Sequence, residues 1–294
     1  MSIRTEYEAY LQRREALASN PMGKRIWLDQ ESRYVHPFRI FGNVWYVGDS
    51  WVCVHLIDTG DGLLLIDSGN CAATAMLVNA IWEAGFNPAD VKWIIHSHGH
   101  VDHIGGAVFF KKMFGTKLYL GEPDARMFRE QPEISLVHES TDLADVLFEP
   151  DEVIRDGDVM TFGNVTMEFF LVPGHTEGCI ACFFDVCDGD QVVRAGYHGG
   201  FGFNTLKKEY LMEIGDRELS MRQRYLASLD KVRNQPVDLF LGNHCINNQT
   251  LERRDRLLAE PDGPNPFIDS TLWGSYLDAK REELLAFMSD PRNN

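Results

Sequence analysis

One short run of the sequence restricts the fold most, because it concentrates metal-binding side chains between a strand and a helix. The run is His98-Gly99-His100-Val101-Asp102-His103. Imidazole nitrogens and carboxylate oxygens are ligands that borderline divalent ions such as zinc accept. The apolar segment 91–95 before it predicts a buried strand, and Gly105-Gly106 permits a tight turn into a predicted helix over 107–114. The run therefore lies on a strand-to-helix loop, a common position for active-site residues.

Two isolated histidines farther along the chain also follow apolar, strand-like segments. His175 comes after residues 167–172, and His244 comes after residues 239–241. A histidine-rich surface loop would not require these two additional residues. We therefore expect three strand ends to deliver six potential ligands: His98, His100, Asp102, His103, His175 and His244.

The hydrophobic periodicity divides the chain into two halves, in each of which strands precede helices. Predicted strands cover residues 40–48, 52–57, 63–69, 117–120, 159–162, 165–172, 180–186, 191–195 and 237–241. Helical patterns cover 73–84, 206–233 and 270–288, and an amphipathic helix is expected over 4–17. This order indicates an α/β protein with two packed sheets and helices outside them.

The histidine run and the two later histidines resemble the signature of the metallo-β-lactamase superfamily over roughly residues 37–250. The resemblance implies a four-layer αβ/βα sandwich with the metal site at the sheet edge. The sequence contains no linker long or polar enough to separate domains, so we expect a single domain over residues 37–294, including the C-terminal helix. Residues 1–36 are then an N-terminal helical extension.

The same resemblance implies how the ligands divide between two metal ions. One metal would be held by His98, His100 and His175, and the second by Asp102, His103 and His244. We expect two zinc ions per chain, with iron or manganese as alternatives, because the set contains no thiolate. In such a site a metal-bound hydroxide attacks the carbonyl of a cyclic amide, ester or similar small molecule. If only one metal binds, Asp102 becomes the candidate catalytic base.

Three more residues are candidates for orienting a ligand or contacting the substrate. Asp67 follows a buried strand and either orients a ligand histidine or forms a plain turn. Tyr197 and His198 lie where many hydrolases of the superfamily carry a metal-bridging acid, and residues 194–200 contain none. His198 either reaches a metal or the substrate, or caps a loop. The missing acid resembles the third subclass (B3) of metallo-β-lactamases.

Charge and composition restrict the partners. The net charge of −16 over 294 residues argues against nucleic acid and against anionic membrane surfaces. The sequence contains no apolar run typical of a transmembrane helix or an export signal, and its six cysteines are compatible with a reducing compartment. We therefore expect a cytoplasmic protein that acts on a small molecule, with the oligomeric state left open.

Two other activities share this fold and remain alternatives. A mononuclear iron dioxygenase of the persulfide type needs only His98, His100 and His175, so the presence of all six ligands favours the dinuclear hydrolase. A lactonase, thioesterase or phosphodiesterase would use the same centre on another substrate. Specificity is expected to depend on loops around residues 121–150 and 199–220.

Overall fold

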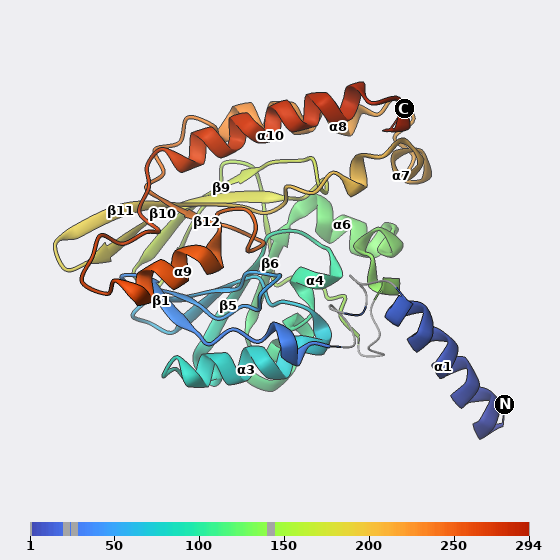
Figure 1. The fold of residues 1–294 in the computed structure, drawn as a ribbon, viewed down its shortest axis with the longest axis horizontal. Coiled ribbons are helices and arrows are strands. Elements are labelled where there is room, and N and C mark those ends of the chain that lie inside the picture. Colours follow the sequence, from blue (N-terminus) through green and yellow to red (C-terminus); the bar gives the residue numbers. More distant parts are fainter. Residues whose placement is uncertain (1, 20–23, 25–28, 140–144, 294) are drawn as a thin grey trace.

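The computed structural model describes residues 2–19, 24, 29–139 and 145–293, and two sheets dominate it (Figure 1). Seven strands form the first sheet, in chain order: β1 (Phe38–Phe41), β2 (Val44–Tyr46), β3 (His55–Asp58), β4 (Leu63–Ile66), β5 (Val91–His96), β6 (Lys117–Gly121) and β7 (Glu152–Ile154). Neighbouring strands are antiparallel from β1 to β4 and parallel from β4 to β7.

The second sheet comes from the other half of the chain. Its order is β12-β11-β10-β9-β8, formed by β8 (Val159–Phe162), β9 (Val165–Leu171), β10 (Ile180–Asp188), β11 (Gln191–His198) and β12 (Leu239–Leu241). Only β11 and β12 are parallel, because the chain crosses over the sheet between them through a helical segment.

Helices cover the outer face of each sheet, which gives four layers. Side chains from α3 (Thr74–Glu83) and α5 (Ala107–Phe114) pack on the first sheet. Side chains from α8 (Ser220–Val232) and α10 (Leu272–Ser289) pack on the second sheet (Figure 1). The predicted αβ/βα sandwich is therefore confirmed.

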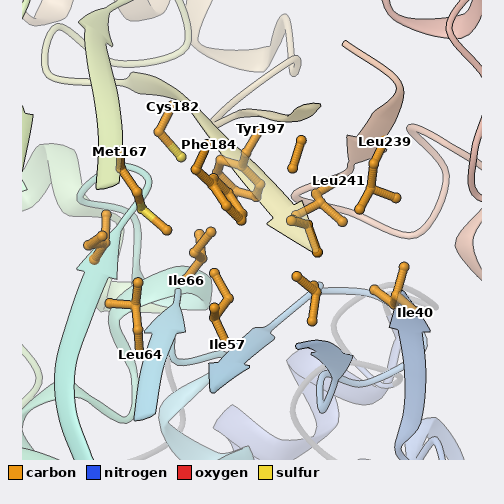
Figure 2. Close-up of a cluster of buried hydrophobic side chains, with 14 of the residues drawn as sticks. Ile40, Ile57, Leu64, Ile66, Met167, Cys182, Phe184, Tyr197, Leu239 and Leu241 are labelled. Atoms are coloured by element: carbon orange, nitrogen blue, oxygen red, sulfur yellow. The ribbon is translucent and has the colours of Figure 1, made fainter. Parts of the chain in front are cut away.

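A common core joins the inner faces of the two sheets. In β4, Leu64 and Ile66 point into this core, whereas Leu63 and Leu65 point to the helices on the other face. Figure 2 shows Leu64 and Ile66 opposite Met167 and other apolar side chains of the second sheet. Strand β4 is apolar at every position because both of its faces are buried.

Several elements differ in detail from the sequence prediction. The segment 40–48 is a hairpin rather than one strand, because Gly42 turns the chain with a φ of 52°. The helical pattern over 206–233 is interrupted at Gly215, which has a φ of 91° and separates α7 (Lys208–Glu213) from α8. Helices α6 (Glu122–Glu130) and α9 (Thr250–Ala259) were not predicted.

The described part of the predicted N-terminal extension contains a helix that is not amphipathic. Helix α1 (Ile3–Ser19) projects from the rest of the chain and buries none of its residues (Figure 1). Charged residues interrupt its apolar positions, so no continuous stripe forms along one face. Residues 1, 20–23 and 25–28 of the predicted extension lie outside the described residues. None of the described helices is long and apolar enough to cross a bilayer.

Candidate metal centre

Three segments carry the predicted ligands, and the structure places them against one another. The first follows β5 and continues into α4 (Val101–Ile104), with His100 directly before that helix. The second follows β9 and contains His175, and the third follows β12 and contains His244. Because β5 belongs to one sheet and β9 and β12 to the other, the ligands meet between the two sheets.

The first triad consists of His98, His100 and His175. His100 Nδ1 lies 3.1 Å from His98 Nε2 and 3.0 Å from His175 Nε2. A zinc ion with tetrahedral bonds of 2.0–2.1 Å separates its nitrogen ligands by roughly 3.3 Å. The ligand atoms of all three histidines lie within 4.8 Å of one another, so one divalent cation could bind between them.

The second triad consists of Asp102, His103 and His244. The Nε2 atoms of His103 and His244 are 3.2 Å apart, and Asp102 Oδ2 lies 3.5 Å and 3.7 Å from them, respectively. Ligand atoms of His98, Asp102 and His103 also lie within 4.8 Å of one another. The two triads therefore adjoin at His98, and a second cation could sit beside the first.

Contacts behind the rings leave the inward nitrogens free to bind. The Nδ1 atom of His175 lies 3.1 Å from the Gly202 carbonyl oxygen, and that of His244 lies 3.1 Å from the Trp51 carbonyl oxygen. An acceptor at Nδ1 holds the proton there and presents the Nε2 lone pair to the centre. Both rings are thereby held in the tautomer that a metal ligand needs.

Asp67 makes the equivalent contact to His103. Its Oδ2 atom lies 2.8 Å from His103 Nδ1 and accepts a 2.6 Å hydrogen bond from the Tyr197 hydroxyl, while Oδ1 accepts one of 2.7 Å from Ser97 N. Burial acts to raise the pKa of Asp67, but the His103 ring and these hydrogen bonds outweigh burial and lower it. The carboxylate is therefore ionised at neutral pH. Tyr197 contacts Asp67 and does not line the pocket described below.

Burial also keeps most of the ligand imidazoles neutral. It lowers the pKa of His98 and His100 well below the usual value, and that of His175 and His244 to about 4. For His103, burial also acts to lower the pKa, but Asp102 and Asp67 raise it overall. Neutral imidazole is the form that binds metal ions.

The structure does not bring His198 into either triad. Its side chain is fully buried, and its ring stacks on Phe201 with the ring centres 4.3 Å apart. The Gly200 N–H donates to its Nδ1 atom at 3.3 Å, and burial lowers its pKa to about 3. His198 thus supports the loop after β11, in agreement with the loop-capping alternative and against contact with a metal or substrate.

A pocket of about 600 Å³ opens over the two triads and reaches His100, Asp102, His175 and His244. Residues 201–204 line it, as do Leu136 and Glu139, so both predicted specificity loops contribute. Trp51 on one side and Lys280 and Glu283 of α10 on the other also line the pocket, although the sequence does not predict them there. No local pattern marks these residues, because they reach the pocket only through the tertiary fold.

Comparison with known proteins agrees with this fold. The BJP-1 subclass B3 metallo-beta-lactamase of Bradyrhizobium japonicum is 26% identical, with a TM-score of 0.76 over 87% of this chain and 95% of its own. The FEZ-1 metallo-beta-lactamase of Legionella gormanii is 25% identical, with a TM-score of 0.76 over 87% of this chain and 96% of its own.

Curated relatives match shorter stretches of the chain. The hydroxyacylglutathione hydrolase GloC of Haemophilus influenzae is 29% identical over 131 residues, which are 44% of this chain and 58% of that protein. The chain spans about half to two thirds of the length of the first curated relatives that it matches. The family model of the metallo-beta-lactamase superfamily matches residues 52–263. Because this family model covers more than half of the chain, the chain belongs to the metallo-β-lactamase superfamily.

Proposed function

We propose that this protein is a zinc-dependent hydrolase that binds two metal ions per chain. It would catalyse hydrolysis at the carbonyl group of a cyclic amide, ester or similar small molecule. The observation that carries the proposal is the pair of adjoining triads at the floor of a pocket of about 600 Å³. A pocket of this size suits a small substrate rather than a polymer.

The proposed ligand partition follows the distances between side chains. His98, His100 and His175 would hold one zinc ion, and Asp102, His103 and His244 would hold the other. All six donors are nitrogen or oxygen, a set that suits zinc best and tolerates iron or manganese. Cys245, which follows His244, does not join the centre, because its sulfur contacts the Tyr46 hydroxyl at 3.1 Å.

The chemistry divides between the ions and the chain. When bound, the ions would supply a water of lowered pKa and polarise the substrate carbonyl. Asp102 lines the pocket with a quarter of its side chain exposed, and neighbouring histidines outweigh burial and lower its pKa. It is therefore ionised at neutral pH, the form that holds a metal ion, and with only one metal bound it could accept a proton at the pocket floor. Asp67 holds the His103 ring behind it.

The persulfide dioxygenase alternative is less well supported. That chemistry uses one iron ion and requires only the first triad, whereas here the second triad is also complete and its histidines are held by Asp67 and Trp51. Among hydrolases, the subclass B3 neighbour favours a cyclic amide, and the hydroxyacylglutathione hydrolase relative favours an ester-like substrate. A lactone and a phosphodiester are also tested, because a lactonase or phosphodiesterase would use the same metal centre. The cytoplasmic location stays a prediction.

The test combines metal analysis with a substrate panel. Zinc-loaded protein is assayed against a chromogenic cephalosporin, a lactone, a thioester and a phosphodiester, with His98→Ala as the blank. His36→Ala is the matched control, because that histidine is exposed and contacts Glu83 instead of the centre. We expect two zinc ions per wild-type chain and turnover of the cephalosporin, the lactone or the thioester that only His98→Ala abolishes, whereas turnover of the phosphodiester alone would contradict attack on a carbonyl. A folded wild type that takes up one iron and no zinc would refute the proposal.

A further inference from the structure

Asp124 is a buried carboxylate that the sequence did not single out. It lies in the first turn of α6, and no part of it is exposed. Its Oδ2 atom accepts hydrogen bonds of 2.8 Å from Gly99 N and 2.8 Å from Thr176 Oγ1, and its Oδ1 atom accepts one of 2.7 Å from Gly178 N. Because the carboxylate is buried and all three hydrogen bonds are short, it strongly constrains the positions of its three donors.

The three donors belong to the two segments that form the first triad. Gly99 lies between His98 and His100, whereas Thr176 and Gly178 follow His175. One carboxylate therefore joins the β5 loop of the first sheet to the β9 loop of the second sheet. None of these three hydrogen bonds involves a residue of the second triad.

Close packing around these contacts leaves little room for the segments to shift. A Cβ atom on Gly178 would lie 2.5 Å from Asp124 N, and one on Gly121 would lie 2.0 Å from the Gly178 carbonyl oxygen. The start of α6 thus presses directly on the backbone that follows His175. A small displacement of this helix would move the His175 ring relative to His98 and His100.

We propose that Asp124 is a positioning residue that holds the two segments of the first triad in register, an inference that rests on the proposed metal site. It does not contact the ligand rings, and it acts through the backbone on either side of them. Contacts that support metal ligands from behind change metal affinity by about 10–100-fold when they are removed. The effect should be confined to the first triad, because the second triad is held by Asp67 and Trp51.

Asp124→Asn is the informative substitution, because it keeps the size of the side chain. The amide presents one acceptor oxygen, and its NH₂ group must face at least one N–H or O–H donor. Asp216→Asn is the matched control: Asp216 also accepts from two backbone amides and one hydroxyl, namely Ser220 N, Met221 N and Ser220 Oγ, at the start of α8. Thr176→Val removes only one donor and serves as a milder second variant.

The experiment isolates each triad with a ligand variant. In a His244→Ala background only the first triad is complete, and in a His98→Ala background only the second. Zinc affinity is measured in both by competition with a chelator at pH 8, since burial raises the pKa of Asp124 to about 6. We expect Asp124→Asn to weaken zinc binding 10–100-fold in the first background and leave the second unchanged. Thr176→Val should follow with a smaller loss, and Asp216→Asn should change neither.

Hydrogen exchange provides a readout that needs no metal. In metal-free protein, the amides of Gly99 and Gly178 should exchange faster in Asp124→Asn than in wild type or Asp216→Asn. Equal zinc affinities in the first background, or equal losses in both, would overturn the inference. A wild type that binds no zinc would refute the proposed function, and the exchange rates alone would then decide whether Asp124 joins the two segments.

Discussion

Asp67 has a backbone conformation that few residues other than glycine adopt, with a φ of 65°. Aspartate and asparagine tolerate this region better than most side chains. Here the conformation directs a fully buried carboxylate at His103, Tyr197 and Ser97 together. The backbone strain therefore accompanies a specific orientation of a predicted metal ligand.

Asp67→Asn tests this orientation without changing the backbone preference. The neutral amide cannot accept from all three donors, and it no longer favours the Nδ1 proton of His103. We expect binding of one zinc ion to weaken about 10–100-fold, measured by chelator competition. Tyr197→Phe is the control, because it removes one hydrogen bond and keeps the contact between Asp67 and His103. Equal affinity of Asp67→Asn and wild type for both ions would contradict the assignment.

His55 is a buried histidine outside both triads that should make stability depend on pH. Its Nε2 atom lies 2.9 Å from the Gly242 carbonyl oxygen, and burial lowers its pKa from 6.5 to about 4. The folded state therefore binds fewer protons than the unfolded state between these values. Its contribution to stability is complete above pH 6.5 and is lost as the pH falls towards 4.

His55→Gln removes this titration and can retain a donor to Gly242. From the two pKa values, the wild type should lose about 2 kcal/mol more unfolding free energy than the variant between pH 7.5 and pH 5. Urea unfolding in the presence of a chelator measures the difference without a contribution from bound metal. The same loss in both proteins would mean that His55 titrates normally in the folded state.

At the scale of single residues, the sequence spacing indicates candidate ligands more directly than it indicates the residues that hold them. The spacing of His98, His100 and His103 is local and can be read directly. For Asp67 the sequence leaves open whether it orients a ligand or forms a plain turn, because its partner His103 lies 36 positions away. No local pattern marks Asp124. The contacts that orient the ligand residues depend on which loops meet in space, and the sequence of one loop does not contain that information.

At the scale of elements, α4 carries two of the predicted ligands and is held by close backbone contact. Gly105, directly after α4, donates to the Gly69 carbonyl oxygen at 2.8 Å. A Cβ atom at Gly105 would lie 1.8 Å from Cys71 N and 2.2 Å from the Asn70 carbonyl carbon. These atoms belong to backbone, so they cannot rotate away as a side chain could.

Gly105→Ala should therefore displace α4 from residues 69–71 and destabilise the protein. We expect a loss on the order of 3 kcal/mol or more in unfolding free energy, measured with urea. Gly274→Ala in α10 is the control, because its Cβ atom would meet nothing closer than 3.9 Å. That substitution should be neutral or stabilise by about 0.5–1 kcal/mol. Similar losses in both variants would contradict the role of the close contact.

The elements that sequence reasoning missed have a common physical origin. Helix α6 is rich in charges along its exposed face, so its segment resembles a polar loop. The hairpin at Gly42 resembles a single strand in the sequence, because apolar residues continue on both sides of the turn. A Cβ atom at Gly42 would lie 2.3 Å from the Cys187 carbonyl oxygen at the end of β10. This turn is thus packed against a remote strand, which local periodicity cannot reveal.

At the scale of the whole molecule, each triad draws its ligands from both sheets. The first combines His98 and His100, after β5, with His175, after β9. The second combines Asp102 and His103 on α4 with His244, after β12. The order of strands and helices favours two packed sheets, but the meeting of the three strand ends at one edge came from the family resemblance. Bound ions would connect the two halves of the sandwich.

This arrangement predicts that zinc stabilises the loops that bind it and also the association of the two sheets. A ligand that binds only the folded state adds about 2.7 kcal/mol when its free concentration is 100 times its dissociation constant. We expect the urea midpoint to rise with free zinc in wild type. The rise should be smaller in His175→Ala or in His244→Ala, and absent in the double variant, which leaves each triad with ligands from one sheet only. A double variant that retains the zinc dependence of wild type would show that the ions stabilise the β5 loop alone.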